Sequence, residues 1–282
     1  MPKATLQFGT VGSPLSTPKN PGGTVGGIRR LAELGLSALE LAWVRSVRVS
    51  AEKCAEIKAA AETSGLALSV HAPFYINLNG SADEWPRSRQ RLMDAAHYGH
   101  LAGATDIIFH PGSYFGSEPR VVLELALPRL RACVSELREA GNPVRLRPET
   151  MGKSAMLGSL EDTLVMAEEI EGVEPCIDFA HLHARPGDGT VNTYAEWEAL
   201  LKLYKKRLGA AAIKRLHIHL SGIEYGPKGE KHHLPLKESD LKYRQLFKAL
   251  RDAGAAGRVM CESPKMEEDA AVMKKEWEKS VK

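Results

Sequence analysis

Short apolar runs alternate with longer amphipathic segments along almost the whole chain. The amphipathic segments extend over residues 23–35, 50–64, 86–102, 119–140, 159–170, 193–207, 239–253 and 267–280. The apolar runs that precede them are TLQFG, SALEL, LALSVH, TDIIFH, VRLRPE, EPCID, KRLHIH and RVMCE. Repetition of a β-type run followed by a helical pattern is typical of a parallel α/β sheet. Eight such units in succession predict a single (β/α)8 TIM barrel with right-handed crossovers.

Composition and charge add few constraints to this picture. Hydrophobic residues make up 43% of the 282 residues, charged residues make up 26%, and the net charge is +3. We expect one domain over residues 1–282, because no linker or shift in composition divides the chain. The four cysteines lie far apart, which indicates neither a disulfide framework nor a thiolate zinc site. Without an apolar signal core, the sequence predicts a cytoplasmic monomer with no membrane segment.

Six of the apolar runs end on a side chain that can bind a metal ion. The C-terminal ends of all strands in a (β/α)8 barrel meet on one face, where active sites form, so these side chains should converge. Carboxylates buried together would repel one another unless a cation neutralises them. The nitrogen and oxygen ligands suit zinc or manganese. The six residues are His71, His110, Glu149, Asp178, His219 and Glu262.

Three further candidate ligands follow strands six and seven. His181 lies three residues after Asp178, and alternation would direct Glu230 and His232 to one side of the loop after strand seven. Nine candidate ligands are enough for roughly two to three zinc ions, with manganese as the alternative metal. Two histidines rank second as ligands: His217, deeper in the barrel than His219, and His233, next to His232.

The motifs around these residues resemble those of the endonuclease IV family of apurinic/apyrimidinic endonucleases. The similar segments are His71 with Ile76-Asn77-Leu78, His110-Pro111-Gly112-Ser113, Glu149-Thr150, Cys176-Ile177-Asp178-x-x-His181 and Glu230-Lys231-His232-His233. The resemblance implies a first zinc held by His71, His110 and Glu149. It implies a second zinc held by Glu149, Asp178, His219 and Glu262, and a third held by His181, Glu230 and His232. Two positions depart from the bacterial pattern, namely Ser221-Gly222 in place of Asn-Asp and Glu230 in place of Asp.

The same resemblance implies a zinc-dependent deoxyribonuclease of DNA base excision repair. Its substrate would be double-stranded DNA, cut on the 5′ side of an abasic site to leave a 3′-hydroxyl. Glu149, or Glu262 beside it, would orient the attacking hydroxide. Recognition of the lesion requires bending the duplex and extruding the damaged nucleotide. Four residues on the loops after strands two and three are the candidate DNA-binding residues: Trp43, Arg45, Phe74 and Tyr75.

Two other functions fit part of the pattern. A sugar isomerase or epimerase related to xylose isomerase would use one divalent metal on Glu149, Asp178, His219 and Glu262. Such a mononuclear enzyme would not need the additional set of His71, His110, His181 and His232. The third hypothesis is a metal-loaded barrel that binds damaged DNA without cutting it.

Overall fold

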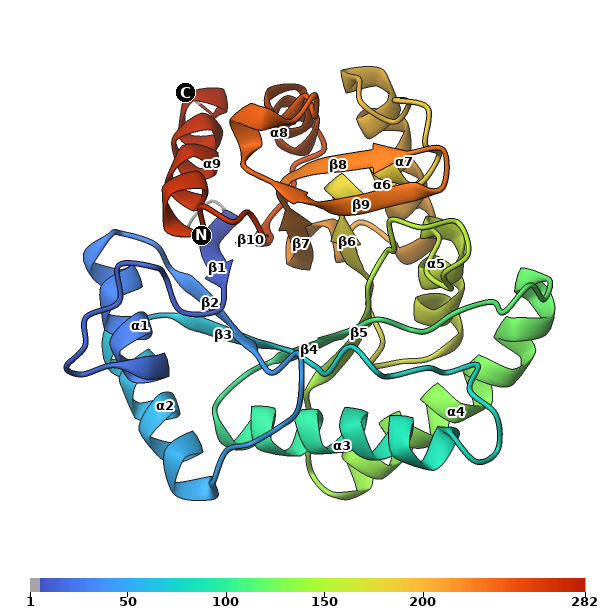
Figure 1. The fold of residues 1–282 in the computed structure, drawn as a ribbon, viewed down its shortest axis with the longest axis horizontal. Helices are drawn as coiled ribbons and strands as arrows, with labels where there is room; N and C mark the ends of the chain where they lie inside the picture. The colour runs from blue at the N-terminus through green and yellow to red at the C-terminus, as the bar shows by residue number, and fades with distance from the viewer. Residues whose placement is uncertain (1–5, 282) are drawn as a thin grey trace.

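The computed structural model describes residues 6–281, in which eight parallel strands form a closed barrel surrounded by helices (Figure 1). The strands are hydrogen-bonded in the order β5-β4-β3-β2-β1-β10-β7-β6. Parallel bridges Leu146–Val173 and Glu149–Cys176 join the two ends of this sheet. The barrel strands are β1 (Leu6–Val11), β2 (Ala38–Ala42), β3 (Ala67–His71), β4 (Asp106–Phe109), β5 (Arg145–Pro148), β6 (Cys176–Asp178), β7 (Leu216–Leu220) and β10 (Gly257–Cys261). The TIM barrel predicted from the sequence is confirmed.

An amphipathic helix packs outside the barrel after each strand. These helices are α1 (Gly23–Glu33), α2 (Ala51–Ser64), α3 (Trp85–Leu101), α4 (Pro119–Glu139), α5 (Leu160–Glu169), α7 (Tyr194–Leu208), α8 (Tyr243–Asp252) and α9 (Glu267–Ser280). Side-chain caps define several starts: Ser50 accepts a hydrogen bond from the N–H of Lys53, and Ser159 forms a reciprocal capping box with Asp162. Capping satisfies backbone N–H groups that have no partner within the helix.

Two insertions interrupt this alternation at the C-terminal ends of the strands. The short helix α6 (Phe179–Ala184) begins directly after β6 and is capped by Asp178, which accepts a hydrogen bond from the N–H of His181 at 2.7 Å. After β7 the chain forms an antiparallel hairpin from β8 (Gly222–Gly226) and β9 (Gly229–Leu234). The hairpin packs on α6, and its Glu230 N–H donates to the Gly152 carbonyl at 2.9 Å. The remaining short elements are 3-10 turns at Ala212–Arg215 and Leu236–Glu238.

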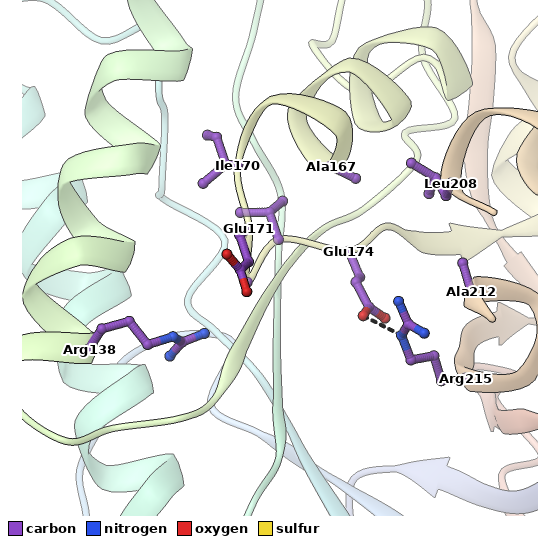
Figure 2. A pocket seen from close by; sticks show the side chains of 10 residues that line it. Arg138, Ala167, Ile170, Glu171, Glu174, Leu208, Ala212 and Arg215 are labelled. Atoms are coloured by element: carbon purple, nitrogen blue, oxygen red, sulfur yellow. Dashed lines mark hydrogen bonds and ion pairs between the residues drawn. The ribbon is translucent and has the colours of Figure 1, made fainter.

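The opposite, amino-terminal end of the barrel contains a network of ion pairs. Arg147 is buried inside the barrel, where its Nε donates to Asp106 Oδ1 at 2.6 Å and its Nη2 donates to Glu174 Oε2 at 3.1 Å. Glu174 also pairs with Arg215 beside a cavity of about 550 Å³, with Arg138 on the far side (Figure 2). Each carboxylate here is paired with two or more guanidinium groups, so this end contributes to stability, as is typical of the amino-terminal face of such barrels.

The core surrounds the barrel strands and the inner faces of the helices, and it contains all four cysteines as free, buried thiols. This agrees with the expected absence of a disulfide framework. Among residues 6–281, no helix combines the length and the apolar character needed to cross a membrane.

Candidate metal centre

Six side chains at the C-terminal ends of the barrel strands meet in one place, as the sequence pattern predicts. His71 and Asp178 are the last residues of β3 and β6, and His219 is the fourth residue of β7. His110, Glu149 and Glu262 directly follow β4, β5 and β10. The parallel register places these strand ends at one level, for example Asp178 opposite His219. Residues far apart in the sequence therefore converge because every strand runs in the same direction.

The first cluster contains His71, His110 and Glu149, whose ligand atoms all lie within 4.8 Å of one another. Glu149 Oε2 lies 3.4 Å from His71 Nε2 and 3.3 Å from His110 Nε2. Two imidazole nitrogens and one carboxylate oxygen are a suitable ligand set for a zinc ion with an open position.

The second cluster contains Glu149, Asp178, His219 and Glu262, again with ligand atoms within 4.8 Å. His219 Nδ1 lies 3.2 Å from Glu149 Oε1 and 3.5 Å from Glu262 Oε1. Glu149 belongs to both clusters, with Oε2 facing the first and Oε1 facing the second. This is the arrangement of a bridging carboxylate between two metal ions.

The third cluster combines Asp178, His181 and His233, with Glu230 at its edge. His181 Nε2 lies 3.1 Å from His233 Nε2 and 3.5 Å from Glu230 Oε2. Asp178 belongs to both the second and the third clusters, so the three clusters overlap. The hairpin supplies two of the four residues, whereas the other clusters are built on the barrel strands.

The structure does not bring His232 into the third cluster. His232 is exposed, and its Nε2 lies 3.5 Å from Glu224 Oε2 on the outer side of the hairpin. The cause is a bulge: Tyr225 pairs with Glu230 and Glu224 pairs with His232, which leaves Lys231 as an extra residue. An extra residue reverses the alternation of side chains along a strand. Glu230 and His233 therefore face the site. The prediction of His232 as a ligand is wrong, and its neighbour His233 lies in the third cluster instead.

The buried carboxylates and histidines of the three clusters perturb one another strongly: burial alone would raise the pKa of Glu149, but His219 holds it well below its usual value. Burial, opposed by His181 and reinforced by Glu262, raises the pKa of Asp178 to about 6. Glu149 Oε2 and Asp178 Oδ2 are buried without a hydrogen bond in the described chain. Leaving carboxylate oxygens buried and unsatisfied is costly unless a cation binds them. The ligand types and these unsatisfied atoms fit divalent metal ions.

The ring orientations of two histidines are fixed by backbone carbonyl groups behind them. His71 Nδ1 lies 2.9 Å from the Ala72 carbonyl, and His181 Nδ1 lies 2.9 Å from the Thr150 carbonyl. For His71, Nδ1 therefore carries the hydrogen and Nε2 faces the first cluster. For His181, Nε2 faces His233, but Nδ1 also lies 3.3 Å from Glu149 Oε1.

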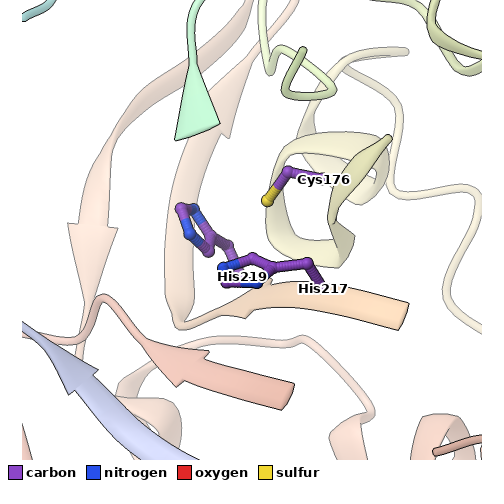
Figure 3. Close-up of side chains that lie close together, drawn as sticks. All are labelled: Cys176, His217 and His219. Atoms are coloured by element: carbon purple, nitrogen blue, oxygen red, sulfur yellow. The ribbon is translucent and has the colours of Figure 1, made fainter. Parts of the chain in front are cut away.

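Sequence reasoning missed one buried acidic residue, Glu40, at the centre of β2. Its carboxylate contacts both His217 and His219 beneath the second cluster. Burial lowers the pKa of His217 to about 4, so this imidazole is neutral at pH 7. Cys176 lies beside the two histidines (Figure 3), and burial raises the pKa of its thiol. The sequence feature that could have indicated this residue is the single carboxylate inside the apolar run SALEL.

A cavity of about 390 Å³ opens directly over the clusters, and Phe74 forms part of its wall. The Phe74 ring stacks on His110 with ring centroids 5.1 Å apart, and it is 46% exposed. Tyr75 is 67% exposed in the neighbouring groove. Arg45 is also exposed, whereas Trp43 is half-buried and packs against the core. Three of the four candidate DNA-binding residues are thus accessible from outside.

Comparison with known proteins places the chain in a family. The sequence profile described as xylose isomerase-like TIM barrel matches residues 28–281. The chain belongs to the xylose isomerase-like TIM-barrel family. It is 38% identical over 271 residues to the uncharacterized protein MJ0133 of Methanocaldococcus jannaschii, covering 96% of both proteins. It is 27% identical over 216 residues to Endonuclease 4 of Thermus thermophilus, covering 74% of this chain and 76% of that relative.

Two solved structures have a fold similar to that of this chain. A D-tagatose 3-epimerase-like protein superposes with a TM-score of 0.73 at 18% identity, covering 98% of both chains. Endonuclease IV from Thermus thermophilus superposes with a TM-score of 0.67 at 20% identity, covering 92% of this chain and 94% of that one. At these identities the similarity concerns the fold, so the reaction must be argued from the site.

Proposed function

We propose that this xylose isomerase-like barrel is a metal-dependent endonuclease that cuts DNA on the 5′ side of abasic sites and leaves a 3′-hydroxyl. The observation that carries the proposal is the overlap of three ligand clusters through Glu149 and Asp178. The three clusters offer more ligands than one ion can use, whereas phosphoryl transfer benefits from two or more ions that share a bridging carboxylate. The 27% identity to Endonuclease 4 supports the same reaction.

Each residue of the site would have a separate role in hydrolysis. When bound, divalent metal ions would lower the pKa of water and offset the negative charge on the phosphate. Glu149, placed between the first two clusters, would hold the attacking water in line with the phosphorus atom. Glu262, whose Oε1 lies 3.5 Å from His219 Nδ1, would accept a hydrogen bond from the same water. Phe74 and Tyr75 would contact the extruded lesion at the rim of the cavity.

The decisive experiment combines metal analysis with incision of a duplex that carries one abasic site. We expect roughly two to three zinc or manganese ions per chain, and a nick on the 5′ side whose end a polymerase can extend. Glu149→Gln and Glu262→Gln should lower the rate by on the order of 10²–10⁴-fold while the barrel remains folded. His97→Ala, an exposed position on α3, is the matched control and should retain activity.

The second candidate function is epimerisation of a ketose, because Glu149, Asp178, His219 and Glu262 alone could hold one divalent metal with carboxylates beside it. A single ion per chain, with epimerase activity and no nicking, would select this function. Tight binding of abasic DNA without any cut, at full metal content, would instead select a non-cutting damage-binding protein.

A further inference from the structure

Glu40 is a fully buried carboxylate beneath the three overlapping clusters, and its ligand atom lies within 4.8 Å of those of His71 and His219. It is the third residue of β2, in the sequence Ala-Leu-Glu-Leu-Ala, and its side chain points into the barrel. An ionised carboxylate at this depth costs several kcal/mol unless polar groups compensate for the lost water. The groups around it therefore indicate what it does.

Two hydrogen bonds and one ion-pair contact surround the Glu40 carboxylate. Ser69 Oγ donates to Oε2 at 2.8 Å, and His217 Nε2 lies 2.8 Å from the same oxygen. The other oxygen, Oε1, lies 2.9 Å from His219 Nε2. Both atoms of this last contact are completely buried, and neither makes an aligned hydrogen bond in the described chain, so they face each other as an ion-pair contact at 2.9 Å. Each is thus the polar neighbour that compensates for the burial of the other.

His219 differs in this respect from the other histidines at the metal centre. His71 and His181 have backbone carbonyl groups behind their rings, and His233 Nδ1 lies 3.3 Å from the Glu262 carbonyl. In those three residues Nδ1 has a backbone carbonyl beside it, although Nδ1 of His181 also lies 3.3 Å from Glu149 Oε1. In His219 the ring is reversed: Nε2 faces Glu40 and Nδ1 faces the second cluster, 3.2 Å from Glu149 Oε1.

We propose that Glu40 is a positioning residue that holds the hydrogen of His219 on Nε2 and thereby presents the Nδ1 lone pair to the metal of the second cluster. A carboxylate behind a metal-binding histidine fixes the ring orientation and makes the imidazole a stronger ligand. Ser69 and His217 hold the carboxylate itself in place from the other side. The inference rests on the metal centre of the proposed function, but it applies to hydrolysis and epimerisation alike.

The variant that tests this role is Glu40→Gln, which keeps the shape of the side chain but replaces one acceptor oxygen with an NH₂ donor. An NH₂ group that faces Nε2 favours the tautomer with the hydrogen on Nδ1, where the metal must bind. We expect the affinity for one Co²⁺ ion per chain to fall by about 10–100-fold in chelator competition. In the Zn²⁺-loaded wild type, NMR of ¹⁵N-labelled histidine should show the His219 hydrogen on Nε2.

Glu33→Gln is the matched control, because it makes the same exchange at an exposed position of α1, far from the metal centre in the fold. It should bind Co²⁺ with wild-type affinity and keep the His219 tautomer. A Glu40→Gln protein that binds Co²⁺ as tightly as wild type would overturn the role of Glu40 and leave the proposed function intact. Should that variant fail to fold, a hydrogen on Nδ1 of His219 in the wild type would overturn it equally. A wild-type chain that binds no divalent ion would refute both proposals.

Discussion

Asp106, at the amino-terminal end of the barrel, is expected to be among the most important single residues for stability. Its carboxylate accepts hydrogen bonds from Arg145 Nε at 2.8 Å, Arg147 Nε at 2.6 Å and Arg258 Nη1 at 3.1 Å. Asp106→Asn preserves the volume of the side chain, so no cavity forms, but it removes the negative charge that three guanidinium groups share. The side chain of Arg147, only 2% exposed, then keeps Glu174 as its acidic partner.

The magnitude follows from the burial of this pair. Removing one partner of a buried ion pair costs about 3–5 kcal/mol, because the remaining charge loses compensation, and Glu174 replaces only part of it for Arg147. The free energy of unfolding of a typical domain is only about 5–15 kcal/mol. Asp106→Asn should therefore remove a large share of it and lower the Tm by roughly 6–20 °C.

Urea denaturation at two pH values provides the assay. Burial alone would raise the pKa of Asp106, but Arg147 and the hydrogen bond from Arg145 hold it well below its usual value. A lowered pKa contributes stability above the unfolded value of about 3.9, and this stability is lost as the pH falls through the folded pKa. The difference between wild type and variant should thus be full at pH 7 and shrink in acid.

The control for this experiment is Glu33→Gln, which breaks an exposed pair with Arg30 and should change stability by less than about 0.5 kcal/mol. If the free energy of unfolding of Asp106→Asn also lay within about 1 kcal/mol of that of wild type at pH 7, Asp106 would not be an important buried ion-pair partner of the three arginines.

Three further predictions concern the metal centre and its rim. His233→Gln should lower the metal content by about one ion per chain, whereas His232→Gln should leave it unchanged; elemental analysis that shows the reverse would contradict the assigned bulge. Because the Asp178 carboxyl must lose its proton to bind metal, Zn²⁺ affinity should fall about tenfold per pH unit below its pKa of about 6, and a flat titration profile would argue against it as a ligand. Replacing Phe74 and Tyr75 with Ala should weaken binding of abasic duplex by about 1–3 kcal/mol per ring at constant metal content; an equal loss on undamaged duplex in fluorescence anisotropy would deny them a role in damage recognition.

Much of the fold and of the metal centre could be predicted because both depend on simple periodicity. Each of the eight strands is an apolar run, and the helices that follow begin at or near the predicted residues, such as Ser50 and Ser159. His71, Glu149 and His219 could be placed together because parallel strands direct their C-terminal ends to one face. That argument needs only the position of a residue within its strand.

The features that sequence reasoning missed depend on local geometry instead. Because Lys231 is an extra residue in the hairpin, His233 rather than His232 faces the site, and the residue types around it do not indicate a bulge. Glu40 was overlooked because it lies inside its strand rather than at the end, although a lone carboxylate in an apolar run is itself unusual. Trp43 follows β2 as expected, but packing against the core could only be seen in the structure.

The hairpin that carries Glu230 and His233 gives the third cluster a property that the other two lack. Its remaining ligands, Asp178 and His181, belong to β6 and α6, so an ion bound there would act as a reversible cross-link between two separate segments. By thermodynamic linkage, an ion that binds only when the hairpin is docked stabilises the docked state. Any free energy needed to dock the hairpin weakens the affinity for the third ion by the same amount. A chelator should therefore release the hairpin to proteases before it disturbs the barrel, and sequence changes in residues 222–234 could tune the third ion without altering the scaffold that holds the other two.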